Sequence, residues 1–564
     1  MFRKNERHQQ WPMFGSICEL PAKLQRRLEE SWADVFYREC FSRIDESLFE
    51  RLYADMDSRP NTPVNVLLSF EILKAGFGWS DIEAYDHFCF DLQVRYAVGH
   101  RNLDEGHFEL RTVYNFRRRV LDHYYRTGQD LLGLVFEQVT DEQLQSLGLV
   151  TSKVRMDSTQ IASNIRNFSR LHLLVEVLRR VRRMLSEVDR ARYAEPLGPY
   201  VKQSSTKFVY GVSSDDGRKH IARIGQVMSR LVKELAANYA KDPTYALLQR
   251  VFEEQFIEED DDWRPRKPEE FRSGTLNSPD DDEATVRRKR NMLYKGYVTN
   301  ITETCADENP FQLIAMVQTA PNRHTDGGFL ETSLLPLKRR LDLDECYTDG
   351  GYNKESLYRT MQALDIEHIQ TGIQGHSSSS HLSLYLYQIE RSDTGEPVRV
   401  TCPQGQKVPV TVRRPGRYHA YYDLEQCQDC PHAQECRAHA YKSRRTLIFT
   451  DYDAEIAKRR QRIEAFKVAG RNPRSAVEST VYAVKRPFGA KLPVRGRYRV
   501  HGLMVASAFM VNVRRIHRGW RHLLSPTESR ICQNAVPGRS FSILADFSRR
   551  IANLLAPCWV SARI

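Results

Sequence analysis

The sequence predicts an α/β protein of several domains, in which the strands of one mixed sheet come from segments far apart in the chain. Strand-like runs occur at 149–159, 297–318, 345–349 and 366–373. Longer segments with helical periodicity precede, interrupt and follow these runs. With 564 residues the chain is too long for a single hydrophobic core, so we expect two to four domains.

The composition is that of an ordinary soluble protein, with 41% hydrophobic and 28% charged residues. A formal net charge of +12 suggests a polyanionic partner. The first residues, MFRKNERHQQW, are charged where a signal peptide would be apolar, and no run approaches the roughly 18 apolar residues of a membrane span. We therefore expect a cytoplasmic protein whose eleven cysteines are thiols or metal ligands rather than disulfides.

Residues 1–148 lack strand-like alternation and predict a helical domain. One helix should begin with Thr62 as its cap and break at Gly76–Gly78, and Ser80–Glu83 has the pattern of a capping box for the next helix. Thr112 should cap a third helix, which carries Arg117, Arg118 and Arg119. Two short helices across a glycine break suggest a helix-turn-helix with phosphate-binding arginines, and a plain bundle with a solvated basic face fits equally well.

A predicted strand over 149–159 ends in Asp157, which the hydroxyl residues Ser158 and Thr159 follow. A carboxylate at a strand end, with a small polar turn after it, can face a cleft and hold a hard cation. Capping of the next turn is the commoner use of an Asp-Ser-Thr sequence. Asp157 is therefore a candidate metal ligand.

Residues 164–291 predict an all-helical insertion. Leu171, Leu174 and Leu178 recur at helical spacing, and Asp242 with Pro243 has the pattern of a helix start. The segment ends in acidic runs at 258–262 and 280–283, which would repel phosphate.

The strand pattern resumes with a probable hairpin over 297–303 and 311–318, a helix over 328–341 and a short strand over 345–349. This last strand ends in Asp349, and the glycines that follow let the backbone turn sharply and leave the carboxylate exposed. A simple Asp-Gly turn is the alternative interpretation. Asp349 is the second candidate ligand, and 366–373 predicts a fifth strand.

The polar segment 375–450 contains four cysteines in a C-x24-C-x2-C-x5-C pattern: Cys402, Cys427, Cys430 and Cys436. Four thiolates suit tetrahedral Zn2+, because a pair separated by two residues can chelate one ion from a tight turn. His432 is an alternative ligand, and unrelated thiols are the competing interpretation.

The segment 470–520 predicts a helix with one carboxylate among bases, followed by an apolar helix over 500–515. Asn472 and Pro473 suit a helix start, and Pro487 ends the helix. Arg474, Glu478 and Lys485 then lie along one face. Glu478 is either a salt-bridge partner of its neighbours or a metal ligand on a helix whose basic residues bind a polyanion. The tail 521–564 carries no pattern that we interpret.

The spacing Arg474-x3-Glu478-x6-Lys485 resembles the end of the Y-x2-R-x3-E-x6-K signature of DDE transposases from bacterial insertion sequences. Arg471 stands where the signature has Tyr, and it keeps a possible phosphate contact. Other segments resemble the same family. They are the Asp-Ser-Thr at Asp157, the TDGGY at Asp349 and the N-terminal segments SRPNTP, GWSD and TVYNFRRR. The cysteine-bearing insertion is similar to that of the insertion-sequence 1182 group.

The resemblance implies an RNase H-like catalytic core built from 149–163, 292–374 and 470–520. Asp157, Asp349 and Glu478 would hold two Mg2+ (or Mn2+) ions, and Arg471, Arg474 and Lys485 would hold double-stranded DNA. The implied activity is cleavage at terminal inverted repeats and joining of the ends to target DNA by two-metal phosphoryl transfer. A homodimer on DNA, association with the nucleoid and structural Zn2+ are expected. The alternative is a catalytically inactive, transposase-derived, zinc-stabilised DNA-binding protein.

Overall fold

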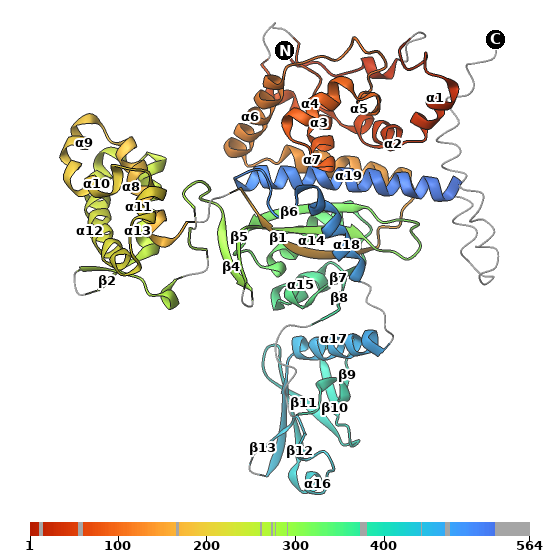
Figure 1. The fold of residues 1–564 in the computed structure, drawn as a ribbon. Coiled ribbons are helices and arrows are strands. Elements are labelled where there is room, and N and C mark those ends of the chain that lie inside the picture. Colours follow the sequence, from red (N-terminus) through yellow and green to blue (C-terminus); the bar gives the residue numbers. More distant parts are fainter. Residues whose placement is uncertain are drawn as a thin grey trace, which may run out of the picture.

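The computed structural model describes residues 1–10, 15–54, 60–164, 168–259, 262–271, 274–276, 278–289, 292–372, 381–441, 443–468 and 474–524. Arg471 and the predicted helix start at Asn472 and Pro473 lie outside these residues. In Figure 1 the N-terminal helices lie above a central sheet, a helical lobe lies to the left of this sheet, and a second sheet lies below it. None of the helices in the described ranges is both long and apolar enough to cross a membrane.

The N-terminal part is helical, as predicted. Its helices are α1 (Ala22–Glu29), α2 (Trp32–Glu39), α3 (Val64–Phe77), α4 (Asp81–Phe90), α5 (Leu92–Ala97), α6 (Leu110–Thr127) and α7 (Leu131–Ser146). The capping box at Ser80 and Glu83 is confirmed. Two predicted caps are wrong: Pro63 occupies the cap position of α3 in place of Thr62, and Thr112 lies inside α6.

The central sheet has the strand order β6–β5–β1–β7–β8, and β4 pairs with the beginning of β5. The strands are β1 (Lys153–Ala162), β4 (Thr285–Lys289), β5 (Met292–Thr304), β6 (Ile314–Pro321), β7 (Glu345–Thr348) and β8 (Glu367–Gln370). β5 is antiparallel to β1 and β6, whereas β7 is parallel to β1 and β8. The helices α14 (Asp326–Arg340) and α15 (Glu355–Ala363) connect β6 to β7 and β7 to β8. The predicted mixed α/β fold is therefore present.

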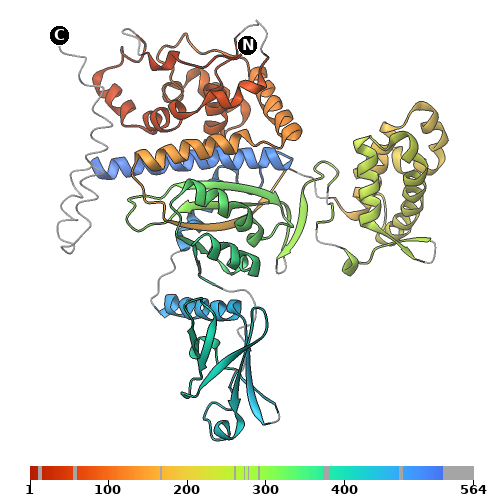
Figure 2. The same ribbon diagram turned by 180° about the vertical axis from the view of Figure 1, so that it is seen from behind.

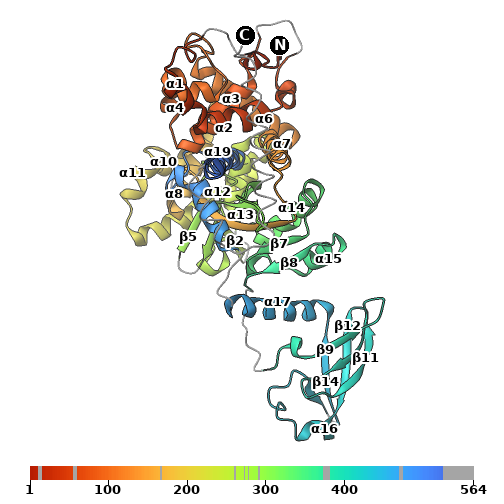
Figure 3. The same cartoon turned by 90° about the vertical axis from the view of Figure 1, so that its right-hand side faces the viewer.

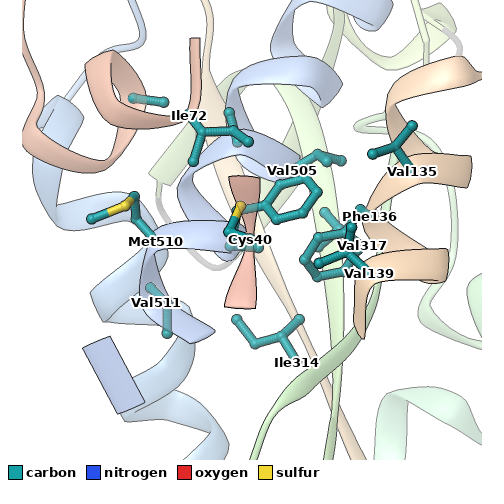
Figure 4. Packing of buried hydrophobic residues seen from close by; sticks show 14 of the residues in the cluster. Cys40, Ile72, Val135, Phe136, Val139, Ile314, Val317, Val505, Met510 and Val511 are labelled. Atoms are coloured by element: carbon teal, nitrogen blue, oxygen red, sulfur yellow. The ribbon is translucent and has the colours of Figure 1, made fainter. Parts of the chain in front are cut away.

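The C-terminal helix α19 (Arg497–Leu524) runs beside α7 between the sheet and the N-terminal helices (Figures 1 and 2). Gly76 of α3 lets α19 approach, because an added Cβ would lie 2.1 Å from Met510 Cγ. One hydrophobic cluster includes side chains from the N-terminal helices, the sheet and α19. Figure 4 shows part of it, with Ile72, Phe136, Ile314 and Met510 packed together. The N-terminal helices and the sheet are thus joined by a shared core.

The insertion after β1 forms a lobe with its own hydrophobic core. Its helices are α8 (Arg170–Met184), α9 (Glu187–Arg192), α10 (Ala194–Val201), α11 (Ser205–Tyr210), α12 (Ser214–Tyr239) and α13 (Pro243–Gln255). The prediction that it is all-helical is wrong, because β2 (Phe256–Glu259) and β3 (Asp262–Pro265) form a hairpin and β4 joins the central sheet. Acidic side chains in the first of these strands masked the apolar alternation by which strands are recognised.

The cysteine-bearing segment folds as a six-stranded antiparallel sheet, which the sequence did not predict. The strand order is β13–β14–β12–β11–β10–β9. The strands are β9 (Gln388–Arg391), β10 (Pro397–Thr401), β11 (Lys407–Arg414), β12 (Arg417–Asp423), β13 (His439–Tyr441) and β14 (Arg444–Phe449), with α16 (Leu424–Gln428) after β12. Figure 3 shows this domain projecting from the rest of the molecule beyond α17 (Asp451–Val468). The helix α18 (Ser475–Lys485) then returns to the central sheet.

Candidate active site

Asp157 lies in the middle of β1 rather than at its end, which corrects the sequence prediction. The strand continues to Ala162 because β5 is long enough to pair with it, from Thr304 opposite Val154 to Gly296 opposite Ala162. The side chain of Asp157 is 17% exposed. It therefore points toward a partly enclosed site.

Asp349 follows β7 directly and lies beside Asp157. In the parallel pairing of β1 with β7, Arg155 is opposite Tyr347, so the two aspartates occupy corresponding positions two residues farther along. The Asp349 carboxylate accepts a hydrogen bond from the backbone N–H of Gly351 at 2.8 Å. This bond fixes the carboxylate at the beginning of the turn that follows the strand.

Glu478 is connected to Asp157 through Arg474. The Arg474 guanidinium lies 3.1 Å from Asp157 Oδ1 and 3.0 Å from Glu478 Oε1. The Glu478 side chain is 64% exposed, so it can change partners without crossing a packed interior. The salt bridge that was one of the two interpretations of Glu478 is therefore formed, and it brings the α18 carboxylate toward the two aspartates.

The three acids affect one another electrostatically. Burial raises the pKa of Asp157 from 3.8 to about 6; Arg474 opposes this shift, while Asp349 and Glu478 increase it. Charged carboxylates in a partly buried site repel one another, and a bound cation would reduce this repulsion. Their oxygens are hard donors of the kind that Mg2+ prefers.

We expect Asp157→Asn to raise the unfolding temperature at neutral pH. The pKa of Asp157 is raised to about 6 in the folded state, so its charged carboxylate is less stable there than in the unfolded chain. Above this pH the charge therefore lowers the stability of the wild type, and the neutral amide of the variant removes this cost. As the pH falls toward about 4, the folded wild type takes up a proton before the unfolded chain does, so it gains stability and the difference disappears. Thermal unfolding of both proteins across this range is the measurement, with the exposed Asp86→Asn as control. A variant that is less stable than wild type at neutral pH contradicts this expectation.

Asp326 is a fourth acid near the site, and the sequence analysis did not identify it. Ser158, next to Asp157, donates a hydrogen bond to Asp326 Oδ1 at 2.6 Å. A Cβ on Gly351 would lie 2.6 Å from Asp326 Oδ2 and 3.0 Å from Asp349 Oδ1. Glycine is therefore required where these carboxylates approach the turn. The only local signal was a polar residue in the first turn of α14, which is common in helices.

A buried charge network fixes the helix that carries Glu478. Glu303 of β5 is 0% exposed and forms ion pairs with Arg155 at 2.6 Å and with Arg515 of α19 at 2.7 Å. Thr480, two residues after Glu478, donates a hydrogen bond to Glu303 at 2.7 Å. Arg515 also donates to the Thr480 hydroxyl. The orientation of α18 thus depends on three other elements.

Lys485, at the end of α18, is directed to β1. Its Nζ donates hydrogen bonds to Thr159 Oγ1 at 3.1 Å and to the Gln160 carbonyl at 2.9 Å. Burial lowers the pKa of Lys485. These contacts fasten α18 to the strand that carries Asp157. The third predicted base of this segment, Arg471, lies outside the described residues.

The three arginines of α6 have different environments. Arg117 forms ion pairs with Glu71 at 2.7 Å and Asp81 at 2.6 Å, which join α6 to α3 and α4. Although burial opposes it, hydrogen bonds from Arg117 and Lys74 hold the pKa of Asp81 well below its ordinary value. Arg118 and Arg119 are exposed, and Arg119 lies over the Tyr53 ring. Only the latter two present their charge to solvent.

Arg117→Ala should therefore destabilise the protein by about 1.5–3 kcal/mol, the usual value of hydrogen bonds to charged groups. Arg118→Ala should leave stability unchanged. If Arg118 contacts a DNA phosphate, as the sequence predicts, the substitution should also reduce the slope of the salt dependence of DNA binding by about 0.9. Chemical denaturation and salt titration of DNA binding separate the two effects. Equal loss of stability in both variants would contradict this assignment.

The four predicted zinc ligands surround one small cavity in the second sheet domain. The cavity has a volume of about 30 Å³, and its lining includes Cys402, Cys427, Cys430, Cys436, Tyr387 and His432. Burial raises the pKa of Cys427; Arg445 opposes the shift, and the other three cysteines add to it. Within the described ranges, however, no three His, Cys, Asp or Glu side chains are arranged so that they could hold a metal ion. The described acids around Asp157 do not form such a group either.

Residues 401–517 match a family model described as "Transposase DDE domain". The matched segment includes the second sheet from Cys402 onward, α17, α18 with Glu478 and most of α19. Asp157 and Asp349 lie before it. No curated protein matches the chain.

Proposed function

We propose that this chain is the DNA transposase of a bacterial insertion sequence of the 1182 group, because the matched domain supports a DDE-type transposase. It would bind the terminal inverted repeats, cleave the DNA strands and join the ends to target DNA. One observation carries the proposal: Asp157 lies on β1, Asp349 directly follows the adjacent parallel strand β7, and Arg474 links Asp157 to the Glu478 carboxylate within the matched segment.

The order of the elements supports an RNase H-like catalytic core. Three antiparallel strands (β1, β5 and β6) precede α14, the parallel strands β7 and β8 follow it, and α18 supplies the last carboxylate. The helical lobe lies between β1 and β5 in the chain, and the second sheet lies between β8 and α18. Both insertions thus leave the central sheet continuous.

Asp157, Asp349 and Glu478 would hold the Mg2+ (or Mn2+) ions. Bound ions in such two-metal sites activate the attacking oxygen and stabilise the leaving oxygen of an in-line displacement. Arg474 must release Glu478 before that carboxylate can join the other two, since it now pairs with both Glu478 and Asp157. Asp157 must be deprotonated to act as a ligand, so activity should decline as the pH falls below the pKa of about 6.

Double-stranded DNA would be held by Arg474 and Lys485 near the acids, by Arg471 just before them in the chain, and by Arg118 and Arg119 of α6. For Arg117, which was also predicted to contact phosphate, the ion pairs with Glu71 and Asp81 support a role in fastening α6. Two transposon ends must be brought together for joining, so a homodimer on DNA is proposed.

The structural Zn2+ at Cys402, Cys427, Cys430 and Cys436 is also a proposal. Soft thiolates select zinc over Mg2+, and a closed four-thiolate site takes no part in phosphoryl transfer. The observation that supports this proposal is that all four cysteines line one cavity.

We expect about one zinc per purified chain. Metal analysis of the wild type, Cys427→Ser and Cys430→Ser is the measurement, and both variants should lose the zinc and unfold at a lower temperature. Cys18→Ser serves as control, because Cys18 is exposed and far from the cavity in the chain. A zinc-free wild type that is insensitive to chelators contradicts the proposal.

A catalytically inactive DNA-binding protein is the second candidate. It is favoured by the engagement of Glu478 with Arg474 and by the absence, within the described residues, of three acids arranged to hold a metal. Incubation of the purified protein with Mg2+ and DNA that carries the ends of its element separates the two. The transposase should cut this DNA, Asp157→Asn should bind without cutting, and a wild type that binds but never cuts supports the second candidate.

A further inference from the structure

One face of the second sheet is covered by exposed cations and aromatic rings. Antiparallel pairing places Thr411 of β11, His419 of β12 and Ile448 of β14 side by side on this face. The other face is different: Tyr418, Ala420, Tyr422, Leu447 and Phe449 are buried in the domain's hydrophobic cluster. The sheet therefore has one packed face and one solvent face.

Three arginines gather around Tyr421 and His419 on the solvent face. The guanidinium carbons of Arg413 and Arg444 lie 5.8 Å and 4.2 Å from the centre of the Tyr421 ring. Arg417 precedes His419 by two residues on β12, and Arg413 follows its cross-strand partner Thr411 by two residues on β11, so both belong to this face. Burial, followed by Arg413 and Arg417, lowers the pKa of His419. Arg413, Arg417 and Arg444 are all exposed. We call this group the Tyr421 face.

The Tyr421 face carries more positive than negative charge. Its acid is Asp423, the cross-strand neighbour of Arg444, and the Asp423 carboxylate accepts a hydrogen bond from the backbone N–H of Glu425 at 3.0 Å. Arg413, Arg417 and Arg444 form no ion pair with any carboxylate of the described chain. Other bases of the same domain do: Lys407 pairs with Glu390 at 2.5 Å, and Arg391 pairs with Asp451 at 2.8 Å. Like charges placed together without counterions raise the energy of the free protein, and an anionic partner removes this repulsion.

We propose that the Tyr421 face binds the phosphate backbone of double-stranded DNA, outside the set of residues assigned to the acids and to α6. Planar guanidinium groups match phosphate oxygens in geometry and charge, and contact of Arg413 and Arg444 with the Tyr421 ring keeps the two cations on the same face. The inference rests on the proposed function, which makes DNA the polyanion that this chain encounters. The domain projects from the core (Figure 3), so this face would lengthen the DNA-binding surface beyond the active site.

The test is DNA binding by the full chain carrying Arg413→Gln, Arg417→Gln and Arg444→Gln together. The probe is a double-stranded oligonucleotide of arbitrary sequence, and affinity is measured by fluorescence anisotropy over a range of salt concentrations. Loss of three phosphate contacts should lower the salt slope by up to about 2.7 and the affinity on the order of 10- to 100-fold. Substitution of the same arginines by lysine should restore most of the slope, because lysine keeps the charge.

The matched control removes three positive charges elsewhere. Lys202, Lys207 and Lys233 are exposed on the helical lobe, and their replacement by glutamine should leave affinity and slope nearly unchanged. An arginine variant that binds like wild type, or a lysine control that loses as much affinity, overturns the inference; DNA cutting by the wild type would then still support the proposed function. A wild type that neither binds nor cuts DNA in Mg2+ overturns both.

Discussion

Glu478→Gln should abolish DNA cutting in Mg2+ while DNA binding survives. The amide keeps the shape of the side chain but removes the charge that holds a divalent cation. Bound ions contribute several kcal/mol to stabilisation of the transition state, so the rate should fall roughly 10³-fold or more. Single-turnover cleavage of end DNA measures the effect, and Asp157→Asn and Asp349→Asn should behave alike. Cleavage by Glu478→Gln at nearly the wild-type rate would show that Glu478 serves only the salt bridge with Arg474.

Glu355→Gln is a suitable control for this experiment. Glu355 pairs with Arg359 one helical turn away at 2.8 Å, as Glu478 pairs with Arg474, and both members of that pair are exposed. An exposed pair of this kind is worth about 0.3–0.5 kcal/mol. The control should therefore cut DNA normally. It separates the loss of a surface ion pair from the loss of a metal ligand.

Glu303→Ala should be among the most destabilising single substitutions in the central core. It leaves Arg155 and Arg515 without their carboxylate in a site where Glu303 itself is 0% exposed. Removal of one partner from a buried ionic network costs about 3–5 kcal/mol. Thermal and denaturant unfolding, followed by tryptophan fluorescence, measure the loss. Cleavage should fall as well, because Thr480 loses the acceptor that orients α18.

Two further variants make this result specific. Glu331→Ala removes an exposed carboxylate that pairs with Lys354 at 2.5 Å, and its cost should be below about 1 kcal/mol. Thr480→Val keeps the Glu303 ion pairs but removes the hydroxyl that donates to Glu303 and accepts from Arg515, so it should cost about 1.5–3 kcal/mol. A Glu303→Ala protein as stable as Glu331→Ala would mean that the network does not hold the core together.

Local patterns were sufficient to predict many individual elements. The capping box at Ser80, the start of α13 at Asp242 and Pro243, the hairpin of β5 with β6 and the short strand before Asp349 were all predicted correctly. These features depend on residues within a few positions of one another, so side-chain type and spacing contain the information. The second sheet was missed because its outward positions are charged and its buried positions include tyrosines and alanine.

The sequence by itself determined which residue types are available: one aspartate in a strand pattern, a second after a short strand, a glutamate on a basic helix and four cysteines in one segment. The tertiary structure alone decided their partners. The pairing of Asp157 with Arg474, of Glu303 with Arg515 and of Arg117 with Asp81 joins residues far apart in the chain. Periodicity and caps depend only on short-range preferences. These contacts form only when strands and helices from distant parts of the chain pack together in a shared core. For the same reason, only the folded chain shows that β1 continues past Asp157, since the length of a strand depends on the strand beside it.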